Sequence, residues 1–191
     1  MSTPETDSLL GRVAQSIGSG DPTPSGRAGR SILSQAAASF AKRPTGAEAT
    51  IPTGFDPMAA SLFEAVVEAA FLVANADGVF DATERQTFER VVAEACQNTV
   101  QGAAVHALVD DLCEQLNEDG LEQRIAMVAG AIRAQEHRLE VLRIAALMAH
   151  ISGGVADTER RVLEKLCASF MLPADSVDRA ILQAQHALTA R

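Results

Sequence analysis

The sequence contains no tryptophan and no tyrosine, and only seven phenylalanines in 191 residues. Hydrophobic residues nevertheless make up 47% of the chain, and much of that share is alanine and leucine. β-Sandwiches and β-barrels draw on valine, isoleucine, threonine and aromatic residues, so this composition argues against both architectures. It fits alanine-rich helices that pack closely.

Basic residues are also few, because 16 Lys and Arg stand against 25 Asp and Glu, for a net charge of −9. A nucleic-acid partner is therefore not expected, since a phosphate backbone is bound by clustered Lys and Arg. Cys96, Cys113 and Cys167 are widely spaced, which predicts buried free thiols rather than disulfides or a thiolate metal site. The chain has neither a basic start followed by an apolar run nor about 18 uninterrupted apolar residues. We expect a cytoplasmic protein without a transmembrane segment.

The chain divides into two regions of different composition. Residues 1–54 hold five of the seven prolines and seven of the thirteen glycines, with a net charge of +1 from five basic and four acidic residues. This region has little apolar mass, which predicts a disordered tail. Two apolar patches in it, Leu9–Ile17 and Ile32–Phe40, have helical spacing and are candidates for folding on a protein partner. The alternative is a solvated tail with no specific role. Residues 55–191 carry 11 basic and 21 acidic residues, a net charge of −10, and form the predicted domain.

Apolar residues in the second region recur with helical periodicity, and no segment alternates with the period of a strand. The first predicted helix is apolar on two sides, with Phe71 and Leu72 outside its main stripe, which is typical of a helix that is central in its bundle or shares a surface with a partner. We therefore predict an all-α fold, a compact seven-helix bundle that follows a disordered tail. The predicted helices span residues 57–75, 82–97, 100–116, 121–135, 139–151, 157–170 and 176–188.

An offset of 75 residues aligns two helix–loop–helix units, one from Ala70 and one from Ala145. The identical pairs are Ala70/Ala145, Leu72/Leu147, Ala74/Ala149, Gly78/Gly153, Thr83/Thr158, Glu84/Glu159, Arg85/Arg160 and Glu89/Glu164. Two copies are too few for a solenoid. They predict a pseudo-repeat, in which two similar helix pairs pack together.

The first loop has three carboxylates within eight residues, Asp77, Asp81 and Glu84. Gly78 permits a positive φ there, and Phe80 provides an apolar anchor. Carboxylate oxygens are ligands for hard cations, and Ca²⁺ takes about 6–8 oxygens, so main chain, water or another helix would supply the remainder. This pattern predicts a site for one divalent cation, most readily Ca²⁺, at these three carboxylates.

The same residues also have a structural interpretation. Asp81 followed three residues later by Glu84 is a capping box for the next helix, and Asp77-Gly78 is ordinary turn chemistry. Compared with an EF-hand loop, the sequence has Val73 where the first aspartate should stand. Capping alone and cation binding both stay open from the residues themselves.

The second loop keeps fewer of these groups. In it the residues His150, Ser152, Gly153 and Ala156 replace Asn75, Asp77, Gly78 and Asp81. Glu159 is then the one matching carboxylate, and no second cation site is expected.

Together these residues resemble the tellurite-resistance TerB-like family. The resemblance rests on Ala76-Asp77-Gly78 with Glu84, echoed by Gly153 with Glu159, and it covers residues 56–190. It implies a compact seven-helix bundle, usually bacterial and cytoplasmic, with no established catalysis. Such domains are tied to tellurite and other stress responses, and their acidic loops are thought to bind divalent metal.

Carried over to this chain, the resemblance makes Asp77 and Glu84 the candidate metal ligands, with Asp81 as a third. Because Ser152 replaces the expected aspartate of the second loop, a two-site metal function is not expected. The four histidines form no ligand pair at helical spacing, and no nucleophile, Walker or dinucleotide motif occurs, so catalysis is not expected.

Two functions follow as hypotheses. The first is a non-catalytic TerB-like protein that binds one divalent cation in a stress-related or regulatory role. The second is a metal-free adaptor that docks into a larger assembly through its N-terminal tail.

Overall fold

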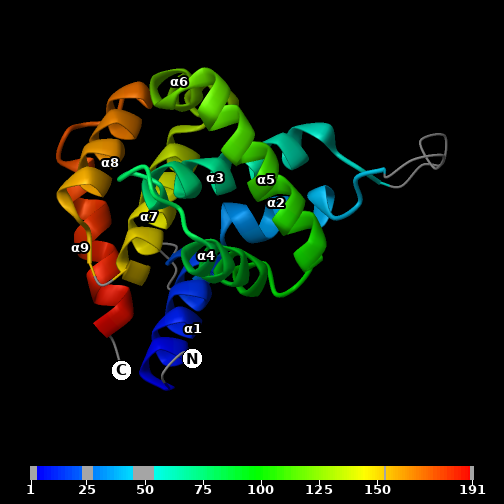
Figure 1. Ribbon diagram of the computed structural model, residues 1–191, viewed down its shortest axis with the longest axis horizontal. Coiled ribbons are helices and arrows are strands. Elements are labelled where there is room, and N and C mark those ends of the chain that lie inside the picture. Colours follow the sequence, from blue (N-terminus) through cyan, green and yellow to red (C-terminus); the bar gives the residue numbers. More distant parts are fainter. Residues whose placement is uncertain (1–3, 23–27, 45–53, 153, 190–191) are drawn as a thin grey trace.

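Figure 1 shows the computed structural model of the chain, which describes residues 4–22, 28–44, 54–152 and 154–189. Within these ranges the fold is all-α, and α3 runs through the middle of the bundle. The helices are α1 (Pro4–Gly18), α2 (Ile32–Phe40), α3 (Pro57–Ala74), α4 (Ala82–Ala95), α5 (Gly102–Asp119), α6 (Leu121–Ala131), α7 (Gln135–Ala149), α8 (Asp157–Ser169) and α9 (Ser176–Thr189). Three minor elements are the antiparallel strands β1 (Ser19–Pro22) and β2 (Ala28–Arg30) and the 3₁₀ helix η2 (His150–Ser152).

The central helix α3 begins at a strong sequence signal. The Asp56 carboxylate accepts hydrogen bonds from backbone N–H groups of the first turn, and Pro57 follows at a position where no N–H is needed. Phe71 and Leu72 are as fully buried as the main apolar stripe, because α2, α6 and α7 cover different sides of the helix. The prediction of a central helix from its two apolar sides is confirmed.

In the described part of the chain, α3 is the one helix long and apolar enough to span a membrane, with a mean hydropathy of 1.6 over 18 residues. Most of its residues are buried inside the bundle, and it carries the acidic residues Glu64 and Glu68. Burial by neighbouring helices accounts for its hydropathy, as in the core helix of a soluble protein.

A buried ion pair joins α3 to α6. Arg124 Nε donates to Glu68 Oε1 at 2.6 Å, and Arg124 Nη1 donates to Asp119 Oδ2 at the end of α5 at 3.0 Å. Burial raises the pKa of Glu68, and the hydrogen bond from Arg124 opposes this rise. Because both members of the pair are buried, either residue alone would leave an uncompensated charge in the core.

All seven helices predicted for residues 55–191 are present, with shifted ends. The largest shift is at α6, which ends at Ala131 rather than at residue 135, and α7 begins at Gln135 rather than at residue 139. Ile132 between them has extended backbone angles (φ −100°, ψ 100°), and its side chain is fully buried. Its side chain continues the apolar pattern after the backbone has left the helix, which explains the overextended prediction.

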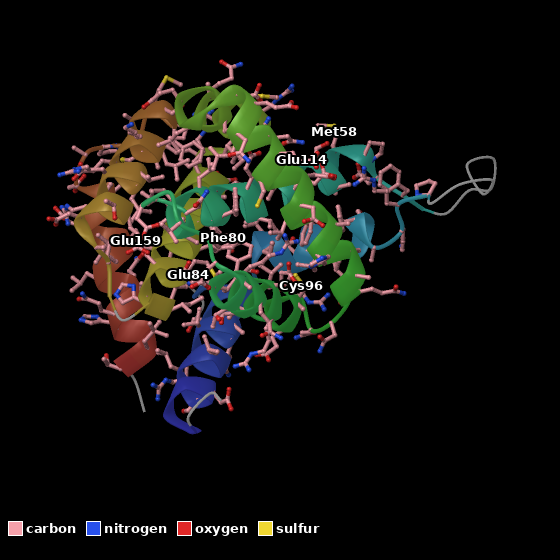
Figure 2. The ribbon with its side chains drawn as sticks, viewed as in Figure 1. Met58, Phe80, Glu84, Cys96, Glu114 and Glu159 are labelled. Atoms are coloured by element: carbon pink, nitrogen blue, oxygen red, sulfur yellow. The ribbon has the colours of Figure 1, made fainter. Side chains whose placement is uncertain are left out.

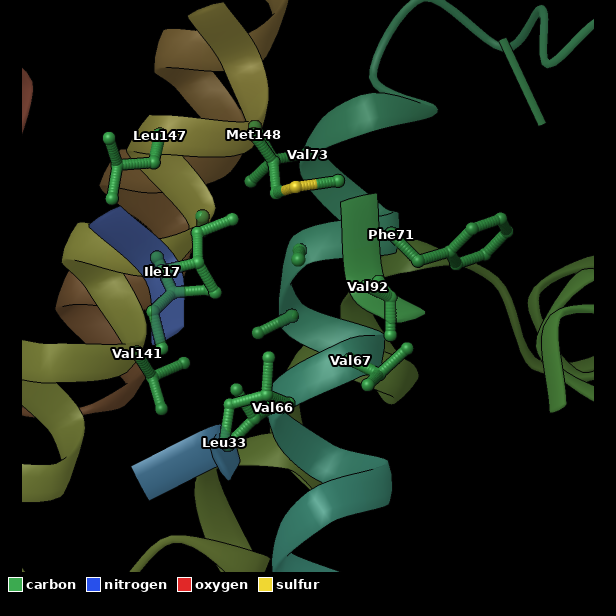
Figure 3. Packing of buried hydrophobic residues seen from close by; sticks show 14 of the residues in the cluster. Ile17, Leu33, Val66, Val67, Phe71, Val73, Val92, Val141, Leu147 and Met148 are labelled. Atoms are coloured by element: carbon green, nitrogen blue, oxygen red, sulfur yellow. The ribbon is translucent and has the colours of Figure 1, made fainter. Parts of the chain in front are cut away.

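The predicted disordered tail is wrong for residues 4–22 and 28–44, and α1 and α2 bring the α-helices of the described ranges to two more than the predicted seven. Both α1 and α2 place apolar faces in the same hydrophobic cluster as the rest of the bundle, as Ile17 and Leu33 show in Figure 3. The buried residues are Leu10, Val13, Ala14 and Ile17 of α1, and Ile32, Leu33, Ala36, Ala37 and Phe40 of α2. The overall composition of residues 1–54 is rich in proline and glycine and therefore predicted disorder. It did not reveal two short apolar faces, which are buried by contact with the other helices. Residues 1–3, 23–27 and 45–53 lie outside the described residues.

The two patches predicted to bind a partner are these same buried faces. In Leu9–Ile17 the apolar side chains pack against α4, α7 and α9, and in Ile32–Phe40 they pack mainly against α3. The prediction that the patches are docking sites is therefore contradicted, because their apolar surface already lies in the core of the chain itself.

Charged side chains of α7 fix the junction between α1 and α2. Arg143 is buried, and its two Nη atoms donate to the carbonyl oxygens of Ser16 and Ser19 at 3.1 Å each. Glu140 Oε1 accepts from the backbone N–H of Ile32 at 2.9 Å, at the start of α2. A positive group at the end of one helix and a negative group at the start of the next both match the helix dipoles.

Gly18 is required where this junction touches α4. A Cβ atom at Gly18 would lie 2.7 Å from the carbonyl oxygen of Ala95, which is closer than real Cβ atoms approach a backbone oxygen. The Ser34 hydroxyl lies between the two segments, 3.2 Å from the Gly18 oxygen and 3.0 Å from the Ala95 oxygen. The N-terminal segment is thus joined to the bundle by close polar packing as well as by apolar burial.

Candidate functional site

The first loop, between α3 and α4, is shaped by its own polar groups. The Gly78 N–H donates to the Asn75 oxygen at 3.1 Å, and the glycine adopts φ +79°, in the left-handed region. Asp77 Oδ1 accepts from the Val79 N–H at 2.9 Å, which closes an Asx-type turn. The turn chemistry predicted for Asp77-Gly78 is confirmed.

The capping box predicted at the start of α4 is also confirmed. Asp81 Oδ1 accepts from the backbone N–H groups of Thr83 and Glu84 at 2.7 and 2.9 Å. Glu84 Oε2 accepts in return from the Asp81 N–H at 3.1 Å. Two of the three candidate cation ligands therefore each satisfy backbone donors at the helix start.

Phe80 anchors the first loop to the core. Its ring packs edge-to-face against Phe71 of α3 and Phe88 of α4, with ring centroids 5.2 and 6.0 Å apart. This geometry is favourable for aromatic pairs and fixes the position of the loop against α3 and α4.

The second loop, between α7 and α8, repeats half of the cap. Glu159 Oε2 accepts from the Ala156 N–H at 2.7 Å, as Glu84 does from Asp81. Ala156 has no side-chain oxygen, so α8 lacks the other half of the box. Glu159 is buried whereas Glu84 is exposed. The side chain of Ser152 and all of residue 153 lie outside what the structure describes.

The two loops face each other across a hollow of about 480 Å³, which we call the interloop cleft. Its lining residues are Ala74, Ala76, Asp77 and Glu84 from the first unit, and Gly154, Val155, Ala156, Thr158 and Glu159 from the second. Figure 2 labels Glu84 and Glu159, which line this cleft from the first and the second unit. Three carboxylates and no lysine or arginine occur among these described lining residues, so the cleft is acidic.

A smaller pocket of about 210 Å³ adjoins the interloop cleft and shares Ala74, Glu84 and Glu159 with it. We call it the Phe80 pocket. Its apolar walls come from five elements and are formed by Leu10, Ala74, Phe80, Phe88, Met148 and Ile151. Thr83, Thr87 and the two glutamates complete the lining.

The structure brings together only part of the predicted cation site. Asp77 and Glu84 line the interloop cleft, whereas Asp81 is not among the lining residues of either hollow. Glu159 joins them from the second unit. Among the described residues, no group of three or more His, Cys, Asp or Glu side chains is arranged to hold a metal ion.

Comparison with known proteins gives one match. Residues 63–182 match the family model described as "Tellurite resistance protein TerB". The chain belongs to the TerB family. The match begins within α3 and ends within α9, so both loops lie inside it and α1 and α2 lie outside it. No curated protein and no solved structure matches the chain.

Within the TerB segment, each unit has an ionic network that ties it to the helix that follows. In the first unit, Arg85 donates to Glu89 and to Asp110 of α5, each at 2.7 Å. In the second, Arg160 donates to Glu164 at 3.1 Å and to Asp178 of α9. The hydrogen bond from Arg85 lowers the pKa of Asp110. In both networks the arginine and the glutamate stand 75 residues apart in the two units, whereas Asp110 and Asp178 are 68 residues apart.

The three cysteines of this TerB chain are free thiols, as predicted. Cys96 and Cys167 are buried, and burial raises the pKa of Cys96 to about 12. Burial also raises the pKa of Cys113 and of Cys167. Thiols with raised pKa values are poor nucleophiles, so these residues act as small core side chains.

The sequence missed the Phe80 pocket and the role of Glu159 in the cleft. A signal for Glu159 existed, because the 75-residue offset aligns it with Glu84. Leu10 gave no such signal, since its place in the pocket depends on how α1 packs against the TerB segment.

Proposed function

We propose that this protein is a non-catalytic binding protein of the bacterial cytoplasm, with a stress-related or regulatory role. The TerB family is generally a non-enzymatic helical domain, which supports a binding function. The observation that carries the proposal is the interloop cleft, where carboxylates from two separate loops line one hollow.

The proposed ligand of the first loop is one divalent cation, most readily Ca²⁺. Asp77, Asp81 and Glu84 are the candidate ligands, and Glu159 adds a carboxylate from the opposite side of the cleft. The cap and turn hydrogen bonds use Oδ1 of Asp77 and Asp81 and Oε2 of Glu84, so the other oxygens would turn toward the ion. Because no ready cluster of three such side chains occurs in the described residues, binding would draw the first loop toward Glu159.

Calorimetric titration of the full chain with Ca²⁺, Mg²⁺ and Zn²⁺ tests the cation proposal. The full chain is needed because α1 and α2 belong to the core. We expect heat with Ca²⁺ and a raised melting temperature, since a ligand at about 100 times its Kd stabilises the folded state by about 2.7 kcal/mol.

Two variants distinguish cation binding at the first loop from nonspecific attraction of the cation to the acidic surface. Asp77→Asn should weaken the binding of the ion, while the double substitution Glu114→Gln and Glu118→Gln removes two exposed charges of α5 outside the cleft and should leave it unchanged. The absence of both heat and a melting shift for all three ions would remove the cation proposal.

A metal-free adaptor role is the second candidate. The observation that favours it is the Phe80 pocket, whose apolar walls a cation would not use. Docking through Leu9–Ile17 or Ile32–Phe40 is not part of this proposal, because those faces are buried.

We also infer that the two helix–loop–helix units are repeats of one ancestral hairpin. Their common 75-residue offset, their matching glutamate caps and their matching ionic networks support this inference.

A further inference from the structure

The Phe80 pocket has the size of a side chain rather than of a small-molecule ligand. Its volume is about 210 Å³, below the range of about 300–1,000 Å³ that drug-sized ligands occupy. Its deeper walls are the buried side chains of Phe88 and Met148, with Leu10 of α1 on another side. An aliphatic or aromatic side chain would bury apolar surface against these walls.

The charged side chains at the mouth of this pocket are all acidic. Glu84 and Glu159 line both the pocket and the interloop cleft, and Asp77 lies further along the cleft. No lysine or arginine is found among the described residues that line either hollow. The region from residue 55 onward carries 21 acidic against 11 basic residues, so the surrounding field is also negative. A complementary partner must therefore bring positive charge beside its apolar group.

The pocket is held in a defined shape before any ligand arrives. Asp81 and Glu84 cap α4, and Phe80 packs against Phe71 and Phe88. Leu10 is held in place because α1 is anchored by Arg143. A site built in this way loses little entropy when it binds a peptide.

We propose that the Phe80 pocket binds a basic peptide segment of another protein. One large apolar side chain of that segment occupies the pocket, and flanking Lys or Arg residues pair with Glu84 and Glu159. This interaction goes beyond the proposed cation site because it needs no metal. It competes with a cation only through the glutamates that the two hollows share.

The test uses the full chain and three fluorescently labelled peptides of equal length, followed by fluorescence anisotropy. The first peptide has a central leucine flanked by lysines, the second has the same leucine flanked by glutamates, and the third has lysines around an alanine. We expect the first to bind about 10- to 100-fold more tightly than the third, from burial of the leucine. The glutamate-flanked peptide should not bind.

Two results of this peptide experiment would overturn the proposal. Equal binding of the leucine and alanine peptides would reduce the interaction to general charge attraction and overturn the proposal. Equal binding of the lysine- and glutamate-flanked peptides would also overturn it, because the pocket would then be a site for apolar groups alone.

Variants locate the binding site. Glu84→Gln combined with Glu159→Gln keeps an oxygen acceptor at both helix starts but removes both charges, and should weaken binding by about two- to fivefold per charge. The matched pair Glu114→Gln and Glu118→Gln removes the same charge elsewhere and should have no such effect. An equal loss in the two double variants would contradict the placement.

A second variant fills the pocket directly. Thr87 is half-buried on α4 and lines the Phe80 pocket, so Thr87→Phe should occupy the space of the peptide side chain and abolish binding. Thermal unfolding checks that this variant is folded, and unchanged peptide binding by folded protein would place the site elsewhere.

Asp77→Asn separates this inference from the cation proposal. Asp77 lines the interloop cleft but is absent from the lining of the Phe80 pocket, so this variant should weaken cation binding and leave peptide binding unchanged. Peptide binding without any cation heat would refute only the proposed cation site, and the reverse result would refute only the peptide site.

Discussion

The two helix–loop–helix units share a glutamate cap and an arginine-centred ionic network but differ in the acidic residues of their loops. In both, a glutamate three residues into a helix accepts the N–H that precedes the helix, and an arginine joins the helix to the one that follows. Only the first unit also has carboxylates at Asp77 and Asp81, where the second has Ser152 and Ala156. The second unit therefore shows that the hairpin forms without these two acids, which makes them candidates for a role beyond folding.

A second contrast lies between a buried charged residue of α3 and one of α7. Glu68 and Arg143 are 75 residues apart, the same offset as the proposed repeat, and both are buried charges of opposite sign. Glu68 ties α3 to α6, whereas Arg143 ties α7 to the end of α1. The buried charge of α3 thus joins two helices inside the TerB segment. The buried charge of α7 joins that segment to α1, which lies outside it.

The largest expected effect comes from breaking the buried pair of the first unit. Arg124→Ala leaves Glu68 without its main partner in the core and should lower the free energy of unfolding by about 3–5 kcal/mol. Urea unfolding followed by circular dichroism measures it. Arg161→Ala, at an exposed site of α8, should cost less than about 0.5 kcal/mol, and a similar loss in both variants would contradict the argument.

The packing of α1 against α4 of the first unit is tested at Gly18. In Gly18→Ala the new Cβ would meet the Ala95 oxygen, so the free energy of unfolding should fall by about 1–3 kcal/mol. Gly11 lies on the same helix with open space around its Cβ position, and Gly11→Ala should stabilise the protein by about 0.4–1 kcal/mol. If both glycines responded alike to the substitution, α1 would not be docked as described.

The helix caps give a smaller and reciprocal effect. Asp81→Ala removes a side-chain cap from α4 and should cost about 1 kcal/mol, whereas Ala156→Asp adds the missing half of the box to α8 and should gain up to about 1 kcal/mol. Thermal unfolding of the two variants and of their combination measures both changes. A destabilised Ala156→Asp protein would show that the second loop differs from the first in more than this side chain.

The smallest effect is expected at the exposed ends of the ionic networks. Asp110→Asn and Asp178→Asn each remove an exposed partner of an arginine, so both should lower the melting temperature slightly and by similar amounts. Molar salt screens exposed charges, so it should reduce both differences. Clearly unequal losses at low salt would mean that the two networks are not equivalent.

Much of the candidate site was predictable because its signals are local. Asp81 and Glu84 are three residues apart and cap a helix by themselves, and Gly78 marks a turn whatever surrounds it. That Glu84 and Glu159 line one cleft was visible only as a sequence offset, since the cleft depends on how α3 packs against α7 and α8. The burial of α1 and α2 was missed because their apolar faces are too small to be stable alone.

The sequence by itself determined the helical class, the seven helices from residue 55 onward, the loop between α3 and α4, and the resemblance to the TerB family. Each of these depends on periodicity or on residues a few positions apart, for which local hydrogen bonding and the spacing of apolar side chains suffice. The tertiary structure alone decided that the N-terminal segment completes the core and that two loops form one acidic cleft beside an apolar pocket. Those features depend on contacts between residues distant in the chain, such as Arg143 with Ser16, and composition and periodicity do not encode such contacts.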